Sequence, residues 1–283
     1  MTFPVEYYRQ IKDAIVFTAR KQAVARKIIN TRNISGGIGV QQWTYDTANE
    51  VSDALLTYQF TDTAEDWIEL TRTDVPIPLL HKEYRISRRD LAAAARGGFG
   101  ISTATVSSAA YKVMNLENQL ILNGFAADGI NYDIKGLYQS AGNSYDTKSD
   151  FGETSGNALA AVAGAIDLMQ ADNITGPYNL ILNPTQYMEL ATSILGSGAG
   201  EREIAMVKEI LEGGNIYSTS FQAAGTGMLL ADASAGFFEM IVAQDMTTET
   251  EVLQKSKDLW GRVYECVIPV VYDANAICKL TDI

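Results

Sequence analysis

The sequence predicts a mixed α+β fold. Three observations predict it: a long helical pattern over 103–123, helices alternating with short strands over 157–218, and a series of strand patterns over 228–280. The chain has 283 residues, 47% of them hydrophobic and 20% charged, which is typical of a globular protein. It can bury a sizeable core in one large domain or two smaller ones, so it needs neither disulfides nor a structural metal for stability.

The first expected element is a helix over Tyr8–Asn30, which contains no Gly or Pro. Its apolar residues form two stripes, so we expect the helix to be covered on two sides. The stripes are Ile11, Ile15 and Ala19 on one side and Phe17, Val24 and Ile28 on the other. The glycine-rich stretch 36–39 is expected to end this helix.

The next expected feature is a hairpin over Val51–Thr73. Apolar and polar residues alternate over 56–61 and again over 68–71, which indicates two half-buried strands on either side of Asp62–Asp66. A hairpin is marginally stable alone in water. We therefore expect its apolar face to pack on another subunit. Pro76 and Pro78 separate it from a further strand over Leu80–Ile86.

The longest helix is expected over Thr103–Asn123, about 30 Å at 1.5 Å per residue, with Gly124 as its C-cap. Beyond it the patterns predict helices over 158–170, 184–194 and 203–211. They predict strands over 178–182, 215–218, 228–231, 238–243, 263–271 and 276–280.

Charge is distributed unevenly along the chain. The formal net charge is −12, which disfavours binding to nucleic acid or anionic membranes. Residues 1–40, however, contain seven basic and two acidic side chains, a net +5 that leaves −17 for the remainder. The basic segment could neutralise phosphates of a nucleic acid or balance acidic groups of its own chain or a partner.

Composition also excludes most catalytic and metal chemistry. Cys266, Cys278 and His81 are the only Cys and His residues, too few for a zinc site or a Cys–His nucleophile pair. No run approaches the roughly 20 apolar residues of a membrane-spanning helix, and the start lacks the pattern of a secretory signal. We therefore expect a reducing cytoplasm and no catalytic residue, metal or cofactor.

Several short motifs have a simpler explanation than chemistry. The loop 196–200 resembles a phosphate cradle, but it follows a predicted helix where such a loop should follow a strand, so an exposed loop is favoured. Asp150-Phe151-Gly152 lacks the other kinase motifs. His81 could serve as a base in a hydrolase, but it lies on the polar side of an alternating strand.

Two further sets of residues also have a structural explanation. Asp62, Glu65 and Asp66 lack the spacing and the glycine of a calcium loop, which favours a polar hairpin tip. Cys266 and Cys278 lie in apolar, strand-like surroundings and are expected to be core residues.

Several stretches, together with the order of the elements, resemble one family. They are Ala25–Asn30, Val75–Leu80, Leu116–Gly124 with Ile134–Leu137, Gly176–Asn183, Gly214–Ser218, Ala243–Met246, Glu265 and Asn275–Ile277. In this order and spacing they resemble the Hong Kong 97-type capsid fold and, within it, the encapsulins. The chain departs from the family at Gly36–Gly39, where a Gly-Pro-x-Gly turn is common, at Asn30, where an acidic residue is common, and over 51–73.

The resemblance implies a domain organisation. It implies an N-terminal helix and arm (1–40), an E-loop hairpin (41–75), a peripheral domain with a long spine helix (76–135 and 236–283) and an axial domain (136–235). It also implies assembly of sixty copies, or a multiple of sixty, into an icosahedral shell.

The resemblance also implies two sites. Arg26, Ile28 and Asn30 would bind a short tag peptide of a cargo enzyme inside the shell, or else they only join the helix to the shell. A pore rim would be formed by Gly196, Ser197, Gly198, Ala199, Gly200, Glu201, Arg202 and Glu203. Charged rings of this kind filter ions by sign.

The implied function is therefore that of a cytoplasmic shell protein, which is not an enzyme and does not bind membranes. The alternative is a viral or proviral major capsid protein of the same fold, in which the basic N-terminal segment would face DNA in a virion. In either case we expect basic groups within the shell and acidic groups outside it or around the pores.

Overall fold

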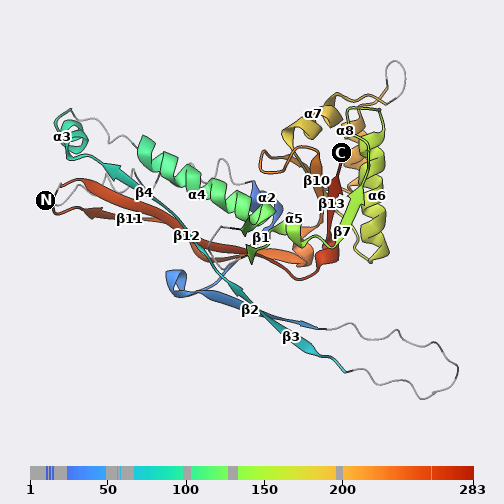
Figure 1. Cartoon of the computed structure of the whole chain (residues 1–283), viewed down its shortest axis with the longest axis horizontal. Helices are drawn as coiled ribbons and strands as arrows, with labels where there is room; N and C mark the ends of the chain where they lie inside the picture. Colours follow the sequence, from blue (N-terminus) through green and yellow to red (C-terminus); the bar gives the residue numbers. More distant parts are fainter. Residues whose placement is uncertain are drawn as a thin grey trace.

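The computed structural model describes residues 11, 13, 15, 24–48, 56, 58, 67–97, 103–126, 133–195, 200–255 and 257–283. Two sheets with helices packed against them form the body, and a two-stranded arm extends away from it (Figure 1). The mixture of helices and sheets confirms the predicted α+β class.

The first sheet has the strand order β1-β11-β12-β4. Its strands are β1 (Asn30–Asn33), β11 (Phe238–Val252), β12 (Leu259–Val271) and β4 (Leu79–Ile86). β12 pairs antiparallel with both β11 and β4, whereas β1 runs parallel to β11. The long helix α4 (Ala104–Asn123) lies along this sheet (Figure 1). β11 is nine residues longer than the predicted strand 238–243, because the polar residues that follow pair with β12 after two register shifts.

The second sheet has the order β7-β13-β10-β8-β9. Its strands are β7 (Asn143–Asp146), β13 (Ile277–Thr281), β10 (Thr226–Ala231), β8 (Tyr178–Leu182) and β9 (Ile216–Ser218). The helices of this part are α6 (Asn157–Ala171), α7 (Pro184–Thr192) and α8 (Glu203–Ile210). The helices and strands predicted between 80 and 231 are confirmed, with ends that differ by two residues at most.

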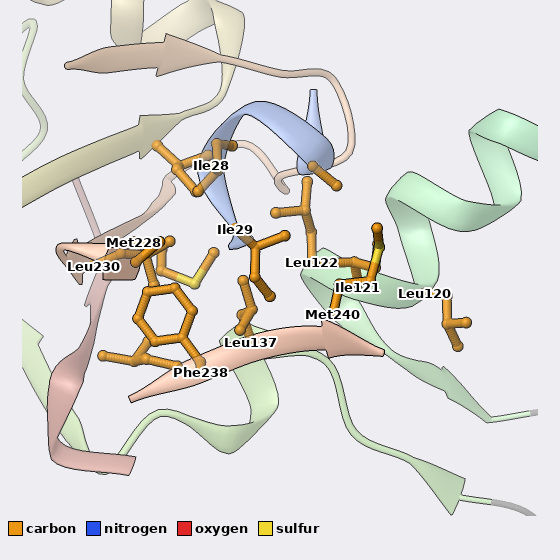
Figure 2. Close-up of a cluster of buried hydrophobic side chains, with 14 of the residues drawn as sticks. Ile28, Ile29, Leu120, Ile121, Leu122, Leu137, Met228, Leu230, Phe238 and Met240 are labelled. Atoms are coloured by element: carbon orange, nitrogen blue, oxygen red, sulfur yellow. The ribbon is translucent and has the colours of Figure 1, made fainter. Parts of the chain in front are cut away.

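A buried cluster joins the two sheets (Figure 2). Met228 and Leu230 of β10 meet Phe238 and Met240 of β11 within it, and all four side chains are fully buried. Leu137 of the short helix α5 (Leu137–Ser140), Ile28 and Ile29, and the end of α4 complete the cluster. Because one core serves both sheets, side chains from the two sheets keep fixed positions relative to one another.

The N-terminal helix is shorter than predicted. Residues 11, 13 and 15 are helical and residues 16–23 lie outside the described part, but after a bend at Val24 the helix α2 covers only Ala25–Ile28. Ile29 is extended and β1 begins at Asn30, so the stretch 36–39 does not end the helix. Residues 37–39 instead form the 3-10 turn η1 (Gly37–Gly39). Pairing of β1 with β11 overrides the helical pattern at Asn30.

The structure has a hairpin in this region, but its paired strands differ from the predicted ones. β2 (Gln42–Ala48) pairs antiparallel with β3 (Leu70–Pro76), from Gln42↔Pro76 to Ala48↔Leu70. Most of the predicted strand over 56–61 lies outside the described residues. β2 was missed because polar pairs support the ladder: Arg72 contacts Asp46 at 2.9 Å, and the Thr44 hydroxyl donates to Asp74 at 2.6 Å.

A helix was also missed directly after β4. α3 (Arg88–Gly97) begins after Ser87. The Ser87 hydroxyl accepts a hydrogen bond from the Asp90 N–H at 3.2 Å and donates one to the Asp90 carboxylate at 2.8 Å. The Ser87 side chain thus caps the start of α3, and Asp90 binds back to the capping hydroxyl. Ser87-Arg88-Arg89-Asp90 was therefore a readable start signal.

One part of the expected domain division needs correction. β13 pairs with β10 and β7 in the second sheet, so residues 277–281 belong with the axial segment 136–235 and not with the rest of 236–283. The short strands β5 (Phe125–Ala126) and β6 (Asp133–Ile134) pair with each other between α4 and α5. The 3-10 turns η2 (Ala233–Ala235) and η3 (Ala274–Ala276) precede β11 and β13. The other domain boundaries stay predictions.

Gly124, which ends α4, is expected to tolerate no side chain. Its φ is +70°, and an added Cβ would lie 2.2 Å from the carbonyl oxygen of Ile134. Gly124→Ala should therefore lower the free energy of unfolding by more than the roughly 1 kcal/mol of a positive φ alone. Gly236→Ala, with φ +79° and open space around the new Cβ, is the matched control. If both variants lose the same free energy of unfolding in urea denaturation, the close approach of Gly124 to the Ile134 carbonyl does not contribute.

Candidate functional site

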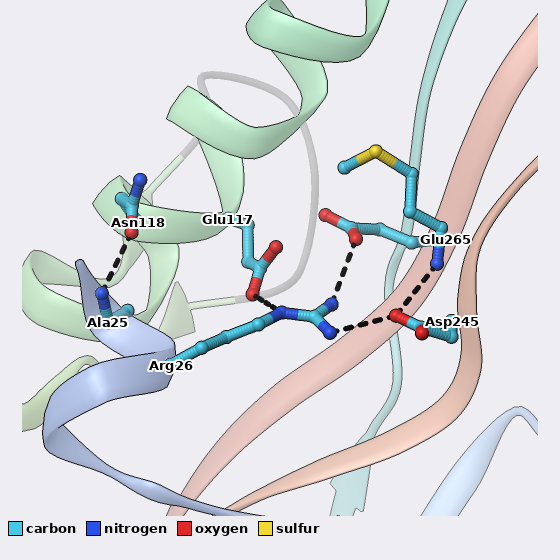
Figure 3. A network of polar contacts seen from close by, with 7 residues as sticks. Ala25, Arg26, Glu117, Asn118, Asp245 and Glu265 are labelled. Carbon is cyan, nitrogen blue, oxygen red and sulfur yellow. Dashed lines mark hydrogen bonds and ion pairs between the residues drawn. The ribbon is translucent and has the colours of Figure 1, made fainter. Parts of the chain in front are cut away.

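The candidate site is built around α2, whose start is tied to the long helix. The Ala25 N–H donates to Oδ1 of Asn118 on α4 at 3.0 Å, inside the protein (Figure 3). The next residue, Arg26, points toward the first sheet. α2 is too short to be stable by itself, so these tertiary contacts hold it in place.

Arg26 contacts three carboxylates from three different elements. Its guanidinium lies 2.6 Å from Glu117 of α4, 2.8 Å from Asp245 of β11 and 3.4 Å from Glu265 of β12 (Figure 3). The side chains of Glu117 and Glu265 are almost completely buried, whereas Asp245 is exposed. We call these four residues the Arg26 network.

The Arg26 network contains more acidic groups than one cation neutralises. Burial, and next the charge of Glu117, raise the pKa of Glu265 well above its ordinary value. Burial works against the charged form of Arg26, but Glu117 and Asp245 outweigh it and raise the Arg26 pKa. Oε1 of Glu265 is buried without a hydrogen-bond partner among the described residues. The arrangement favours an undissociated Glu265 beside a permanently charged Arg26.

A groove of about 290 Å³ lies beside α2, between β1 and the β8–β9 edge of the second sheet. Polar groups form most of its wall. They come from Lys27, Asn30, Asn179, Asn215, Tyr217 and Asp232, with the backbone of Gly213 and Gly214. The Asn30 amide donates to the Ala233 carbonyl at 2.8 Å, and the Asn215 N–H donates to Oδ1 of Asn179 at 3.0 Å. We call this cavity the amide groove.

The three residues predicted to bind cargo all line the amide groove, but their side chains differ in how accessible they are to a ligand. The Arg26 guanidinium is occupied by the Arg26 network, and the Ile28 side chain is 2% exposed within the core. Both therefore fit the alternative in which they join α2 to the body. Asn30 is exposed, so its amide is accessible from the groove.

Glu117, Asn118 and Glu265 lie in stretches that carry the family resemblance, but no role in a site was predicted for them. A signal was present for Glu265, which is the one charged residue of the apolar stretch Val263–Val271, whereas Glu117 and Asn118 lie among other polar residues of α4. A charged residue inside an apolar helix or strand predicts a buried partner. The partner itself could not be named, since Arg26 is 91 residues from Glu117 and 239 from Glu265.

The predicted pore rim lies partly outside the described residues, which resume at Gly200 after Leu195. The chain is closed at the base of this loop, where the Leu195 N–H donates to the Glu201 carbonyl at 3.0 Å and Ile194 pairs with Arg202. Glu201 and Arg202 are exposed.

Glu203 needs correction as a rim residue. Its side chain is fully buried, and its carboxylate accepts from the Leu159 N–H at 2.7 Å and from the Gly156 N–H at 3.3 Å. It thus caps the start of α6, where the helix dipole favours a negative charge. A carboxylate held in this way adds no charge to a pore.

Asp62, Glu65 and Asp66, the predicted polar hairpin tip, lie outside the described residues. The other candidates lie in positions that fit a structural role. His81 is exposed on β4, and both cysteines are buried with free thiols. Asp150-Phe151-Gly152 forms a turn in which the Gly152 N–H donates to the Asp150 carboxylate. The described residues contain no group of three metal-ligating side chains, and none of their helices is long and apolar enough to cross a membrane.

Part of the positive charge of the first 40 residues balances acidic groups of the chain itself. Arg26 lies in the Arg26 network, and Arg32 contacts Glu239 at 3.2 Å and stacks over Trp43. Lys27 is exposed. The other four basic residues, Arg9, Lys12, Arg20 and Lys21, lie outside the described part.

Comparison with known proteins gives a consistent result. Residues 3–259 match a family model described as "encapsulating protein for peroxidase". The chain is 28% identical over 238 residues to a diheme-cytochrome-encapsulin shell fusion protein of Kuenenia stuttgartiensis. The aligned region covers 82% of this chain but only 62% of that protein. It is 23% identical to the type 1 encapsulin shell protein EncA of Myxococcus xanthus, covering 97% and 92% of the two chains.

Solved structures share the fold at low sequence identity. A virus-like particle from Pyrococcus furiosus matches with a TM-score of 0.71 and 20% identity, over 97% of this chain and 99% of the other. The capsid of Myoviridae phage XM1 matches with a TM-score of 0.73 and 15% identity, over 92% of each chain. The fold is therefore the Hong Kong 97-type capsid fold, as predicted.

The raised pKa of Glu265 predicts how stability varies with pH. The native state holds a proton that the unfolded chain releases near the ordinary pKa of 4.5. The stabilisation from this proton is complete below that pH and is lost as pH rises through the raised native pKa. Glu265→Gln should remove this decline, which is at most about 1.4 kcal/mol per pH unit.

Urea denaturation over a pH series, on wild type and variant, measures the effect. Glu251→Gln neutralises an exposed carboxylate of β11 and serves as the control. Its free energy of unfolding should vary with pH as that of the wild type does. If the free energy of unfolding varies with pH in the same way in wild type and in Glu265→Gln, the raised pKa does not belong to Glu265.

Proposed function

On the premise that this chain belongs to the encapsulin family of shell proteins, we propose that its copies enclose a cargo protein that is held through a short peptide in the amide groove. As an encapsulin shell protein the chain acts by assembling in many copies into an icosahedral compartment, and it is not an enzyme. The amide groove is the observation that carries the cargo part of the proposal.

The chemistry of the amide groove suits an extended peptide. A peptide backbone needs a donor or an acceptor at each residue, and side-chain amides offer both. Asn30, Asn179 and Asn215 supply such amides, and Lys27 and Asp232 add one charge of each sign. Arg26 is a positioning residue in this proposal, because the Arg26 network fixes α2 and thereby Asn30 over the groove.

The family description names a peroxidase as the enclosed protein, and the Kuenenia relative is named as a fusion with a diheme cytochrome. For this chain we propose a separate cargo enzyme with a peptide tail. We further propose a cytoplasmic compartment, which the two unpaired thiols support. The loop 196–202 is proposed as a pore rim, with Glu201 and Arg202 as its charged residues.

A viral or proviral capsid protein is the second candidate, because a phage capsid shares the fold with a TM-score of 0.73. At 15% identity that likeness concerns the fold alone. The family match over residues 3–259 favours the compartment.

Electron microscopy of the purified protein, together with analysis of particle contents, tests the proposed function. We expect closed icosahedral particles that contain protein and little nucleic acid. Particles filled with DNA would favour the capsid alternative. If the protein forms only small oligomers under all conditions of pH and salt, the proposed shell function is wrong.

Removing amides from the groove should lower cargo loading without affecting the shell. Each lost hydrogen bond is worth about 1 kcal/mol, so Asn30→Ala with Asn215→Ala should weaken tail binding by about 30-fold. The measurement is cargo per particle after co-expression with a tailed peroxidase. Asn33→Ala, an exposed amide on the same strand as Asn30 but outside the groove, is the control. If wild type, the double variant and the control carry the same amount of cargo per particle, the tail binds outside the amide groove.

A further inference from the structure

The Arg26 network and the amide groove share the helix α2. Residues 26–30, which are most of α2 and the start of β1, line the groove. On its other side α2 extends the Arg26 guanidinium between Glu117 and Glu265 (Figure 3). A change in the charge of the Arg26 network therefore acts directly on a wall of the amide groove.

The Arg26 network is balanced only when one of its buried carboxyls carries a proton. It holds one cation and three carboxylates, of which Asp245 is exposed to solvent. With a proton on Glu265, the buried part is the ion pair of Arg26 and Glu117. Without that proton, two buried carboxylates share one guanidinium, and a single cation does not offset both their desolvation and their mutual repulsion.

The hydrogen bonds of Glu265 agree with a bound proton. Its Oε1 is buried and accepts no hydrogen bond from the described residues. A protonated carboxyl donates a hydrogen bond, and the carboxylate of Glu117 is the neighbour with which Glu265 forms one. A proton on Glu265 thus satisfies two buried acidic side chains at once.

Few charged or titratable groups face Glu265. They are Arg26 of α2, Glu117 of α4, Asp245 of β11 and the neighbouring Cys266 of β12. β4 places Leu80 opposite Glu265, and η1, which also packs against β12, has no ionisable side chain. Tyr138 of α5 lies against Lys279 of the second sheet. Among these groups that face Glu265, Arg26 alone is a cation, so the charge state of Glu265 depends on whether α2 is docked.

α2 is the element of the Arg26 network that yields most easily. It has four residues and is held by Arg26, by the bond from the Ala25 N–H to Asn118 and by the buried side chains of Ile28 and Ile29. β11 and β12, in contrast, pair along most of their length. Local opening begins where contacts are few. Opening of α2 lets water reach the buried carboxyls and removes a wall of the amide groove.

We propose that α2 is a proton-dependent latch on the amide groove, docked while Glu265 is protonated and opened when that proton is lost. This inference rests on the proposed function, because it concerns the peptide that the groove is proposed to hold. The docked form binds one proton more than the open form, in which the carboxyl has its ordinary pKa of 4.5. Rising pH therefore favours the open form by at most about tenfold per pH unit, from pH 4.5 up to the raised pKa of the docked form.

Tail binding and proton binding reinforce each other in this arrangement. A peptide that needs the wall formed by residues 26–30 binds only the docked form, so it stabilises that form by mass action. Because such coupling is reciprocal, a filled groove keeps α2 docked, and Glu265 protonated, to higher pH. The apparent affinity for the tail falls in proportion to the docked fraction as pH rises.

Hydrogen exchange on assembled particles tests the latch. The N–H groups of Ala25, Lys27 and Ile29 are hydrogen-bonded while α2 is docked, and a helix this short does not persist alone. Their protection factors, which are corrected for the intrinsic pH dependence of exchange, should fall in empty wild-type particles by up to about tenfold per pH unit. The Gly124 N–H, bonded to Leu120 in α4, is the internal reference and should keep its protection.

Three variants identify the group that titrates. Glu265→Gln resembles a protonated carboxyl and cannot ionise, so the protection of α2 should not change with pH. Glu117→Gln removes the charge beside Glu265, which then pairs with Arg26 in its ionised form, so the pH dependence should again be lost. This second variant keeps the test open if Glu265→Gln does not fold. Glu251→Gln removes an exposed carboxylate of β11 and should behave as the wild type does.

Loading with cargo separates the latch from the proposed function. In particles co-expressed with a tailed peroxidase, α2 should be protected at least about tenfold more than in empty particles at the same alkaline pH. If protection in empty particles does not change with pH, or changes equally in Glu265→Gln, the latch is wrong and the proposed tail site is unaffected. If empty and loaded particles give the same protection at every pH, both the coupling and the amide groove as the tail site are wrong.

Discussion

The Arg26 guanidinium is the interaction on which the rest of the structure depends. It holds together carboxylates from α4, β11 and β12, which lie 91, 219 and 239 residues further along the chain. Glu117 and Glu265 are both buried, and a buried acidic group that loses its cationic partner is strongly destabilising. The first sheet is therefore incomplete until α2 docks, and docking of α2 places β1 against β11 and Asn30 over the amide groove.

The position of the amide groove follows from the shared core. Its walls come from α2 and β1 on one side and from the β8–β9 edge of the second sheet on the other. Met228 and Leu230 pack against Phe238 and Met240 below it, so the two sheets cannot shift independently (Figure 2). A peptide site formed between two parts of one chain keeps its geometry only when such a core is present.

Local charge matters more for this protein than its net charge of −12. Residues 1–40 are basic, with a net charge of +5, whereas residues 41–75 are acidic, with a net charge of −7. Arg26 and Arg32 form ion pairs with acidic groups of the chain itself. An assembling subunit also needs unmatched surfaces, because a chain that satisfied all of its own groups would stay a monomer.

The sequence by itself determined the α+β class, the long helix with its glycine cap, most strands of both sheets and the family resemblance. These features depend on periodicity and on caps, which act over a few residues. Only the tertiary structure decided that α2 ends at Ile28, that β2 pairs with β3, that β13 joins the second sheet and that Glu203 caps α6. Each of these depends on a partner distant in sequence, and a pattern read along one segment carries no information about which distant segment will meet it.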